Sequence, residues 1–128
     1  MLFKNMNVVF LLILLVPKIA ICKTIEYKCS YPKYASIEGI KTEKSFELTF
    51  MIDETTKKTY MKGNNGISEL KMIDVQFGGI SFLEITDGGN IVTTAIDKNN
   101  LSVHSRNSII MGELVASQYY GKCIKNVN

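Results

Sequence analysis

The sequence is poor in the side chains that carry most metal and enzyme chemistry. Its 128 residues include no tryptophan, one histidine (His104), one arginine (Arg106) and three cysteines. A zinc site needs several histidine or cysteine ligands, and a serine or cysteine nucleophile needs a base beside it. The sequence therefore predicts no metal, no cofactor and no enzymatic activity. Most of the available carboxylates fall at predicted turns or outward strand positions, which disfavours hydrolysis by a carboxylate pair; the carboxylates are Asp53, Glu54, Asp74, Glu84 and Asp87.

A strong charge of either sign is also missing. The formal net charge is +3, and it falls to +1 without Lys4 and Lys18 of the N-terminal segment. The remaining lysines are scattered and form no basic stripe of the kind that nucleic-acid binding requires, so nucleic acid is excluded as a partner. Tryptophan and arginine, which most often anchor protein interfaces, are scarce, so tyrosines are expected to supply contacts with a partner.

The first 22 residues have the layout of an export signal. Lys4 precedes an apolar run over residues 8–16, which is about half the length that a membrane-spanning helix needs. Small residues at minus three and minus one, Ala20 and Cys22, predict cleavage before residue 23. The alternative is a lipoprotein acylated at Cys22, although Ile21 is a poor neighbour for that reaction. We expect a signal peptide over residues 1–22, one domain over residues 23–128, a periplasmic or secreted location and no permanent membrane span.

Two cysteines remain after cleavage, Cys29 and Cys123, near opposite ends of the mature chain. An oxidising compartment favours one intramolecular bridge between them; the alternative is a pair of free or intermolecular thiols. The bridge would enclose most of the domain, for which chain-entropy models give roughly 4 to 5 kcal/mol of stabilisation. It would also make the first and last strands neighbours, which favours a sheet closed by its termini.

Apolar and polar residues alternate along the mature chain with the period of two that is typical of β-strands. Phe46, Leu48, Phe50 and Ile52 are expected to point inward, and Glu47, Thr49 and Met51 outward. Further strands are predicted at residues 25–31, 57–62, 70–77, 80–86, 91–97, 101–106, 109–117 and 119–125, with Gly112 as a kink or turn. Residues 32–44 could be a loop or hold a strand around 36–40, and residues 68–72 are the most helix-compatible segment.

This spacing of strands and turns predicts an all-β fold, a single antiparallel sandwich or small barrel of about eight strands with its termini tied by a disulfide. A barrel of this size has an interior that side chains can fill. The residues expected there are Phe46, Leu48, Phe50, Ile52, Phe77 and Phe82.

Five residues are candidates for contact with a partner: His104, Arg106, Tyr119, Tyr120 and Lys122. With Leu101 and Val103 assigned to the interior, the outward face of that strand would carry His104 and Arg106 together with Ser102. The adjacent tyrosines should point to opposite faces of their strand, so that one packs in the core and the other lies outside beside Lys122.

Four segments resemble a group of small exported proteins of Gram-negative bacteria whose activity is uncharacterised. These segments are Tyr27-Lys28-Cys29, the phenylalanine-rich stretch over residues 45–50, residues 106–114 and Tyr120-Gly121-Lys122-Cys123. The resemblance lies in their order and spacing and covers most of the mature chain, with a departure at residues 106–112. It implies a periplasmic β-rich fold with a terminal disulfide, and it implies no activity.

The sequence predicts a non-enzymatic interaction module whose partner is a protein of the cell envelope or extracellular space. Two alternatives stay open. An inhibitor of a cell-wall hydrolase of the lysozyme type would insert a rigid loop into the enzyme, and the turns at residues 63–66 and 87–90 could serve. A lipocalin-like carrier of a small ligand would need space left unfilled inside the barrel.

Overall fold

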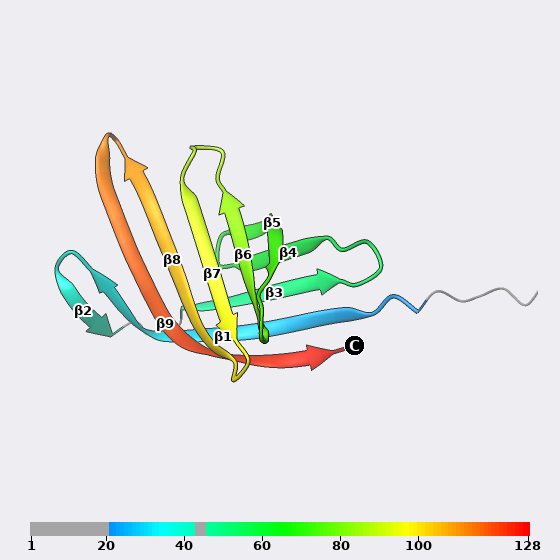
Figure 1. Ribbon diagram of the computed structural model, residues 1–128. Coiled ribbons are helices and arrows are strands. Elements are labelled where there is room, and N and C mark those ends of the chain that lie inside the picture. Colours follow the sequence, from blue (N-terminus) through cyan, green and yellow to red (C-terminus); the bar gives the residue numbers. More distant parts are fainter. Residues whose placement is uncertain (1–20, 43–45) are drawn as a thin grey trace, which may run out of the picture.

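The computed structural model describes residues 21–42 and 46–128, and this part of the chain consists of β-strands joined by turns (Figure 1). The strands are β1 (Thr24–Ser36), β2 (Gly39–Thr42), β3 (Glu47–Asp53), β4 (Thr59–Gly63), β5 (Gly66–Asp74), β6 (Gly79–Ile85), β7 (Ile91–Asp97), β8 (Leu101–Ile110) and β9 (Glu113–Val127). The predicted all-β class is confirmed. Nearly all of the predicted export signal lies outside the described residues.

The strands form one antiparallel sheet that closes on itself. Each strand from β3 to β8 pairs with the next along the chain, and β1 pairs with both β3 and β9. β1 and β3 to β9 therefore make a closed eight-stranded barrel, and β2 is an additional strand paired with the end of β1. Of the two predicted architectures the chain adopts the barrel, in which the closing pair leaves the first and last strands without the exposed edges of an open sheet.

A disulfide joins Cys29 of β1 to Cys123 of β9, directly across the seam that closes the barrel. The two cysteines are 94 residues apart in the sequence. The same seam continues to the chain ends, where the backbones of Thr24 and Asn128 exchange two hydrogen bonds of 3.0 Å. The predicted bridge is confirmed, and the first and last strands are neighbours, as we expected from it.

The barrel interior is filled by side chains from alternate positions of each strand. On β3, Leu48, Phe50 and Ile52 are buried and Glu47 is exposed, which confirms the predicted register. Phe50 is fully buried, and its ring stacks on that of Phe82 from β6 with 4.8 Å between centroids. Aromatic side chains bury large apolar areas, so this pair occupies much of the space that a deep ligand cavity would need.

Two predicted orientations are wrong. Phe77 is 96% exposed, because it lies in the turn after β5 with a φ of 65° and points away from the barrel. On β8 the faces are reversed: His104 is only 3% exposed, whereas Leu101 is 48% exposed. The prediction that Ser102, His104 and Arg106 share one face is right, but that face is the inner one.

Several predicted segments have different bounds in the structure. The predicted strands at residues 101–106, 109–117 and 119–125 are two long strands, β8 and β9, joined by a turn at Met111 and Gly112. Residues 68–72 belong to strand β5, and residues 36–40 comprise the end of β1, a turn at Ile37 and Glu38 and the start of β2. The two long strands reach beyond the neighbouring strand β7 at one end of the barrel (Figure 1).

Candidate functional site

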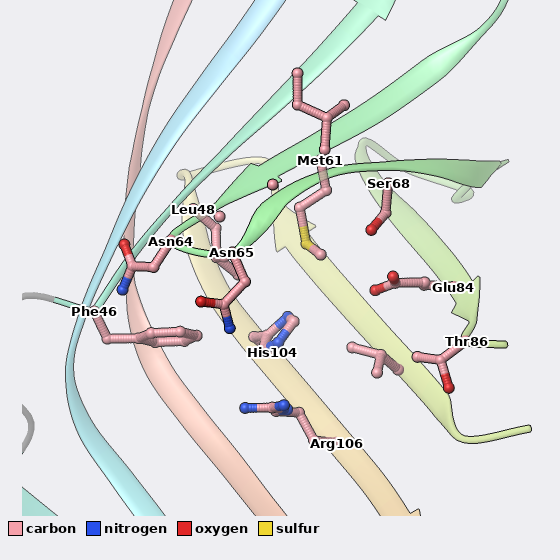
Figure 2. Close-up of a pocket in the computed structure, with 14 residues that line it drawn as sticks. Phe46, Leu48, Met61, Asn64, Asn65, Ser68, Glu84, Thr86, His104 and Arg106 are labelled. Atoms are coloured by element: carbon pink, nitrogen blue, oxygen red, sulfur yellow. The ribbon is translucent and has the colours of Figure 1, made fainter. Parts of the chain in front are cut away.

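A pocket of about 290 Å³ lies at one end of the barrel, where the β4–β5 and β6–β7 turns meet the inner faces of β3 and β8 (Figure 2). We call this site the mouth pocket. It is lined by Phe46, Leu48, Met61, Gly63, Asn64, Asn65, Gly66, Ile67, Ser68, Glu84, Thr86, Val92, His104 and Arg106. Polar groups converging on an apolar floor at the mouth of a β-barrel are typical of a binding site for a small ligand.

One row of inward-facing side chains crosses three neighbouring strands at the pocket. Val92 on β7 pairs with Glu84 on β6 and with Arg106 on β8. The sheet therefore places a carboxylate and a guanidinium on either side of one aliphatic residue, and both charged groups reach into the pocket (Figure 2). A ligand in the pocket would meet positive charge on one side and negative charge on the other.

His104 forms part of the pocket floor and is held in the neutral state. Its Nδ1 atom lies 2.8 Å from the hydroxyl oxygen of Thr94 on β7, within hydrogen-bond distance. Burial disfavours the charged imidazolium, and the positive charge of Arg106 adds to this effect, so the pKa of His104 falls to about 4. Near neutral pH the histidine can accept or donate hydrogen bonds, and Arg106 supplies the positive charge of the pocket.

Aromatic rings support the floor from behind. The ring of Phe46 lies 5.8 Å from that of His104 and 4.4 Å from that of Tyr119, measured between centroids. Tyr119 in turn stacks on Tyr34 from β1 at 5.4 Å. These contacts connect β1, β8 and β9 with the residue that precedes β3, so the floor is built on a set of rings that crosses the closing seam.

Deeper in the barrel, two buried polar side chains form a second hydrogen-bonded pair. The hydroxyl of Tyr31 lies 2.8 Å from that of Ser102, and both residues are buried. Burial raises the pKa of Tyr31 to about 12, because the phenolate would lose its hydration. The pair therefore stays uncharged, and its position below His104 makes it a structural element beneath the pocket.

The five residues predicted for partner contact are divided between the inside and the outside of the barrel. His104 and Arg106 come together in the mouth pocket, and Tyr119 packs against its floor. Tyr120 points outward, where its hydroxyl donates a hydrogen bond of 2.7 Å to Gln118, and Lys122 is exposed. The prediction that the adjacent tyrosines point to opposite faces is confirmed.

Sequence reasoning missed the other polar residues of the pocket. Glu84 was assigned to a turn or an outward position, but it lies two residues after the buried Phe82 and shares its inward face. That spacing was a usable signal. Ser68 lies in the segment that is most compatible with a helix, and Asn64 and Asn65 belong to the turn at residues 63–66, which the sequence suggests only as a loop for an inhibitor.

Within residues 21–42 and 46–128, no group of three or more histidine, cysteine, aspartate or glutamate side chains is placed to hold a metal ion. Among the same residues there is no helix of the length and apolarity needed to cross a membrane. In the comparisons with known proteins, no family model, no curated sequence and no solved structure matches the chain.

Proposed function

We propose that the protein is a non-enzymatic binding module and that its binding site is the mouth pocket. The observation that carries this proposal is the combination of an apolar floor, built from Phe46, Leu48 and Met61, with two opposite charges, Glu84 and Arg106, in one concave site. A site of this composition can enclose the apolar part of a ligand and orient its polar part.

The site of action in this proposal is the periplasm or the extracellular space. The disulfide between Cys29 and Cys123 supports an oxidising compartment, since such bonds form and persist there. The export signal predicted over residues 1–22 and the resemblance to exported Gram-negative proteins point the same way. Both stay predictions.

The occupant that we propose is a small molecule, which makes the protein a carrier with a shallow site. The pocket volume of about 290 Å³ is near the lower end of the range of roughly 300 to 1,000 Å³ for small-molecule sites. The stacked rings of Phe50 and Phe82 fill the interior farther in. The ligand would therefore be held at the mouth, in contrast to the deep cavity of a lipocalin-like barrel.

A mass measurement on matched variants tests this proposal. Mature protein with its disulfide intact is equilibrated with the small-molecule fraction of a cell-envelope extract and analysed by native mass spectrometry. Ser68→Trp places a large ring inside the pocket, and Ser105→Trp places the same ring on the outer face of β8. We expect an adduct on the wild type and on Ser105→Trp that is absent from Ser68→Trp. An adduct that persists in Ser68→Trp, or none on any form, would contradict the proposal.

A second candidate function is binding of a protein partner through the β8–β9 hairpin. Ile109 and Leu114 pair across its two strands and are 65% and 75% exposed, and Met111 at its turn is fully exposed. Exposed apolar patches on soluble proteins often mark interaction sites. A projecting hairpin also suits an inhibitor that enters the cleft of a cell-wall hydrolase, although residues 109–114 would then replace the loops at 63–66 and 87–90 predicted for that role.

Capture from a cell-envelope extract separates the two candidates. A double variant, Ile109→Ser and Leu114→Ser, removes the apolar pair from the hairpin and leaves the mouth pocket unchanged. If the hairpin binds a partner, a protein captured by the wild type and by Ser68→Trp should be lost from the double variant. Capture by all three forms alike would argue against the hairpin.

A further inference from the structure

The charged side chains of the mouth pocket, Glu84 and Arg106, are not paired with each other. The ion pairs found among the described residues are Lys23 with Glu54, Lys28 with Glu26 and Lys41 with Glu38. Glu84 and Arg106 both line the pocket and lie two strands apart, on either side of Val92. Neighbouring strands are separated by about 4.7 to 4.9 Å, so the two backbones are roughly 10 Å apart with the pocket in front of them.

A ligand with a single charge would pair with only one of the two charged side chains, Glu84 or Arg106. The other charged group would lose hydration as the ligand covers it and would gain no partner, which costs binding free energy. A ligand that carries an ammonium and a carboxylate can pair with both side chains at once. The carboxylate can accept two hydrogen bonds from the guanidinium of Arg106, and the ammonium can donate to the carboxylate of Glu84.

The rest of the pocket fits the apolar part of such a molecule. Phe46, Leu48 and Met61 lie on the side away from the charged row (Figure 2). Val92 presents an aliphatic surface between the two charges. An aliphatic side chain that extends from between an ammonium and a carboxylate would reach this floor when both charges are paired.

We infer that the ligand of the mouth pocket is a small zwitterion with an apolar side chain, in the class of apolar α-amino acids and short apolar peptides. This inference rests on the proposed function and adds the chemical class of its ligand. Free amino acids and short peptides both carry an ammonium, a carboxylate and an apolar side chain. They differ in the distance between the two charged groups.

Three compounds of similar shape test the inference by isothermal titration calorimetry. Leucine carries both charges, 4-methylpentanoate lacks the amine, and isoamylamine lacks the carboxylate. We expect leucine to bind about ten-fold or more tightly than either analogue, since each charge-assisted hydrogen bond contributes on this scale. Dileucine is titrated in parallel: tighter binding than that of leucine assigns the site to peptides, and weaker binding assigns it to free amino acids.

Variants at the two charges give the matched controls. Glu84→Gln should weaken leucine binding and strengthen 4-methylpentanoate binding, because no unpaired carboxylate is then covered by that anion, and Arg106→Gln should weaken binding of both. Glu47→Gln and Lys122→Gln remove exposed charges outside the pocket and should change neither affinity.

The outcomes distinguish the inference from the function on which it rests. Equal affinities for leucine and 4-methylpentanoate, with no effect of Glu84→Gln, would overturn the inference that the ligand is a zwitterion. The proposal of a small-ligand site would still stand. The same conclusion follows if neither leucine nor dileucine binds while the extract still yields an adduct that Ser68→Trp removes. If no compound binds and no adduct forms, the proposed function and the inference both fail.

Discussion

The backbone of Gly121 on β9 lies so close to the carbonyl group of Ser30 on β1 that no side chain fits between them. The approach occurs where the register of β1 and β9 shifts, between Ser30 and Lys33. A bulge of this kind places an additional residue in one strand and bends it. Glycine in the segment that precedes Cys123 is therefore a requirement of barrel closure.

Gly121→Ala should destabilise the protein by about 2 kcal/mol or more, because the added methyl group meets main-chain atoms that cannot move aside as a flexible side chain would. Urea unfolding followed by circular dichroism measures the change. Gly88→Ala is the control, since a β-carbon there makes only ordinary contacts. Equal midpoints for the two variants would show that the seam can relax around a side chain.

Replacing Cys29 and Cys123 by serine should lower the melting temperature strongly and leave the β-sheet spectrum intact. The bridge closes a loop of 94 residues and acts mainly on the unfolded chain, with an upper estimate of about 4 to 5 kcal/mol. Thermal unfolding by far-ultraviolet circular dichroism checks both parts. Loss of the β-sheet signal at low temperature would mean that the bridge is needed for the fold itself.

The mature protein should begin at Lys23 and carry one disulfide. Cleavage after Cys22 follows from the spacing of small residues in the export signal, and the bridge uses both remaining cysteines. The intact mass of the exported protein, measured with and without reductant, tests start site and bridge together. An N-terminal lipid on Cys22, or two thiols that alkylate without reductant, would contradict this prediction.

Phe50→Ala should cost roughly 3 to 5 kcal/mol, because it empties a fully buried site and removes the stacking partner of Phe82. Thr49→Ala, one residue earlier on the opposite face of β3, should change stability by less than about 0.5 kcal/mol. Denaturant unfolding of both variants measures the contrast. Similar losses for the two would contradict the assigned register.

Stability should fall as the pH is lowered from about 6.5 to about 4, and His104 is the cause. The folded protein holds His104 neutral down to a pKa of about 4, whereas in the unfolded chain a histidine takes up its proton near pH 6.5. The unfolded state therefore binds more protons over this interval, and acid favours it by up to about 3 kcal/mol. The residues found against the ring are Thr94, Phe46, Tyr31, Tyr119 and the cationic Arg106, and none of these carries a carboxylate that would stabilise the imidazolium.

His104→Gln provides the matched test of this pH dependence, because it removes the titrating group and keeps a polar side chain beside Thr94. Unfolding free energies of both proteins are measured between pH 4 and 7. The variant should show a much flatter profile over this interval. An unchanged slope would assign the pH dependence to other groups.

The amino-acid sequence by itself determined the class of the fold and much of its register. The alternation in residues 46–52 places large apolar side chains on one face of β3 and polar ones on the other, so a single face can be buried there. The two mature cysteines near the chain ends predicted which strands meet. The turns rich in glycine and asparagine separated most of the strands, although they did not show that residues 101–110 form one continuous strand.

Tertiary structure alone decided which way β8 faces and where the pocket lies. Leu101 and Val103 are more apolar than Ser102 and His104, so local patterning points the wrong pair inward. The folded sheet reverses this choice because it supplies each buried polar group with a partner on another strand, Tyr31 of β1 for Ser102 and Thr94 of β7 for His104. A hydrogen-bonded polar group can be buried at little cost. Thr94 lies opposite His104 in the β7–β8 pairing, whereas Tyr31 and Ser102 become neighbours only when the sheet closes. The pairing of β6, β7 and β8 brings Glu84 and Arg106 to one row, and only the complete barrel sets that row in a pocket with the β4–β5 turn.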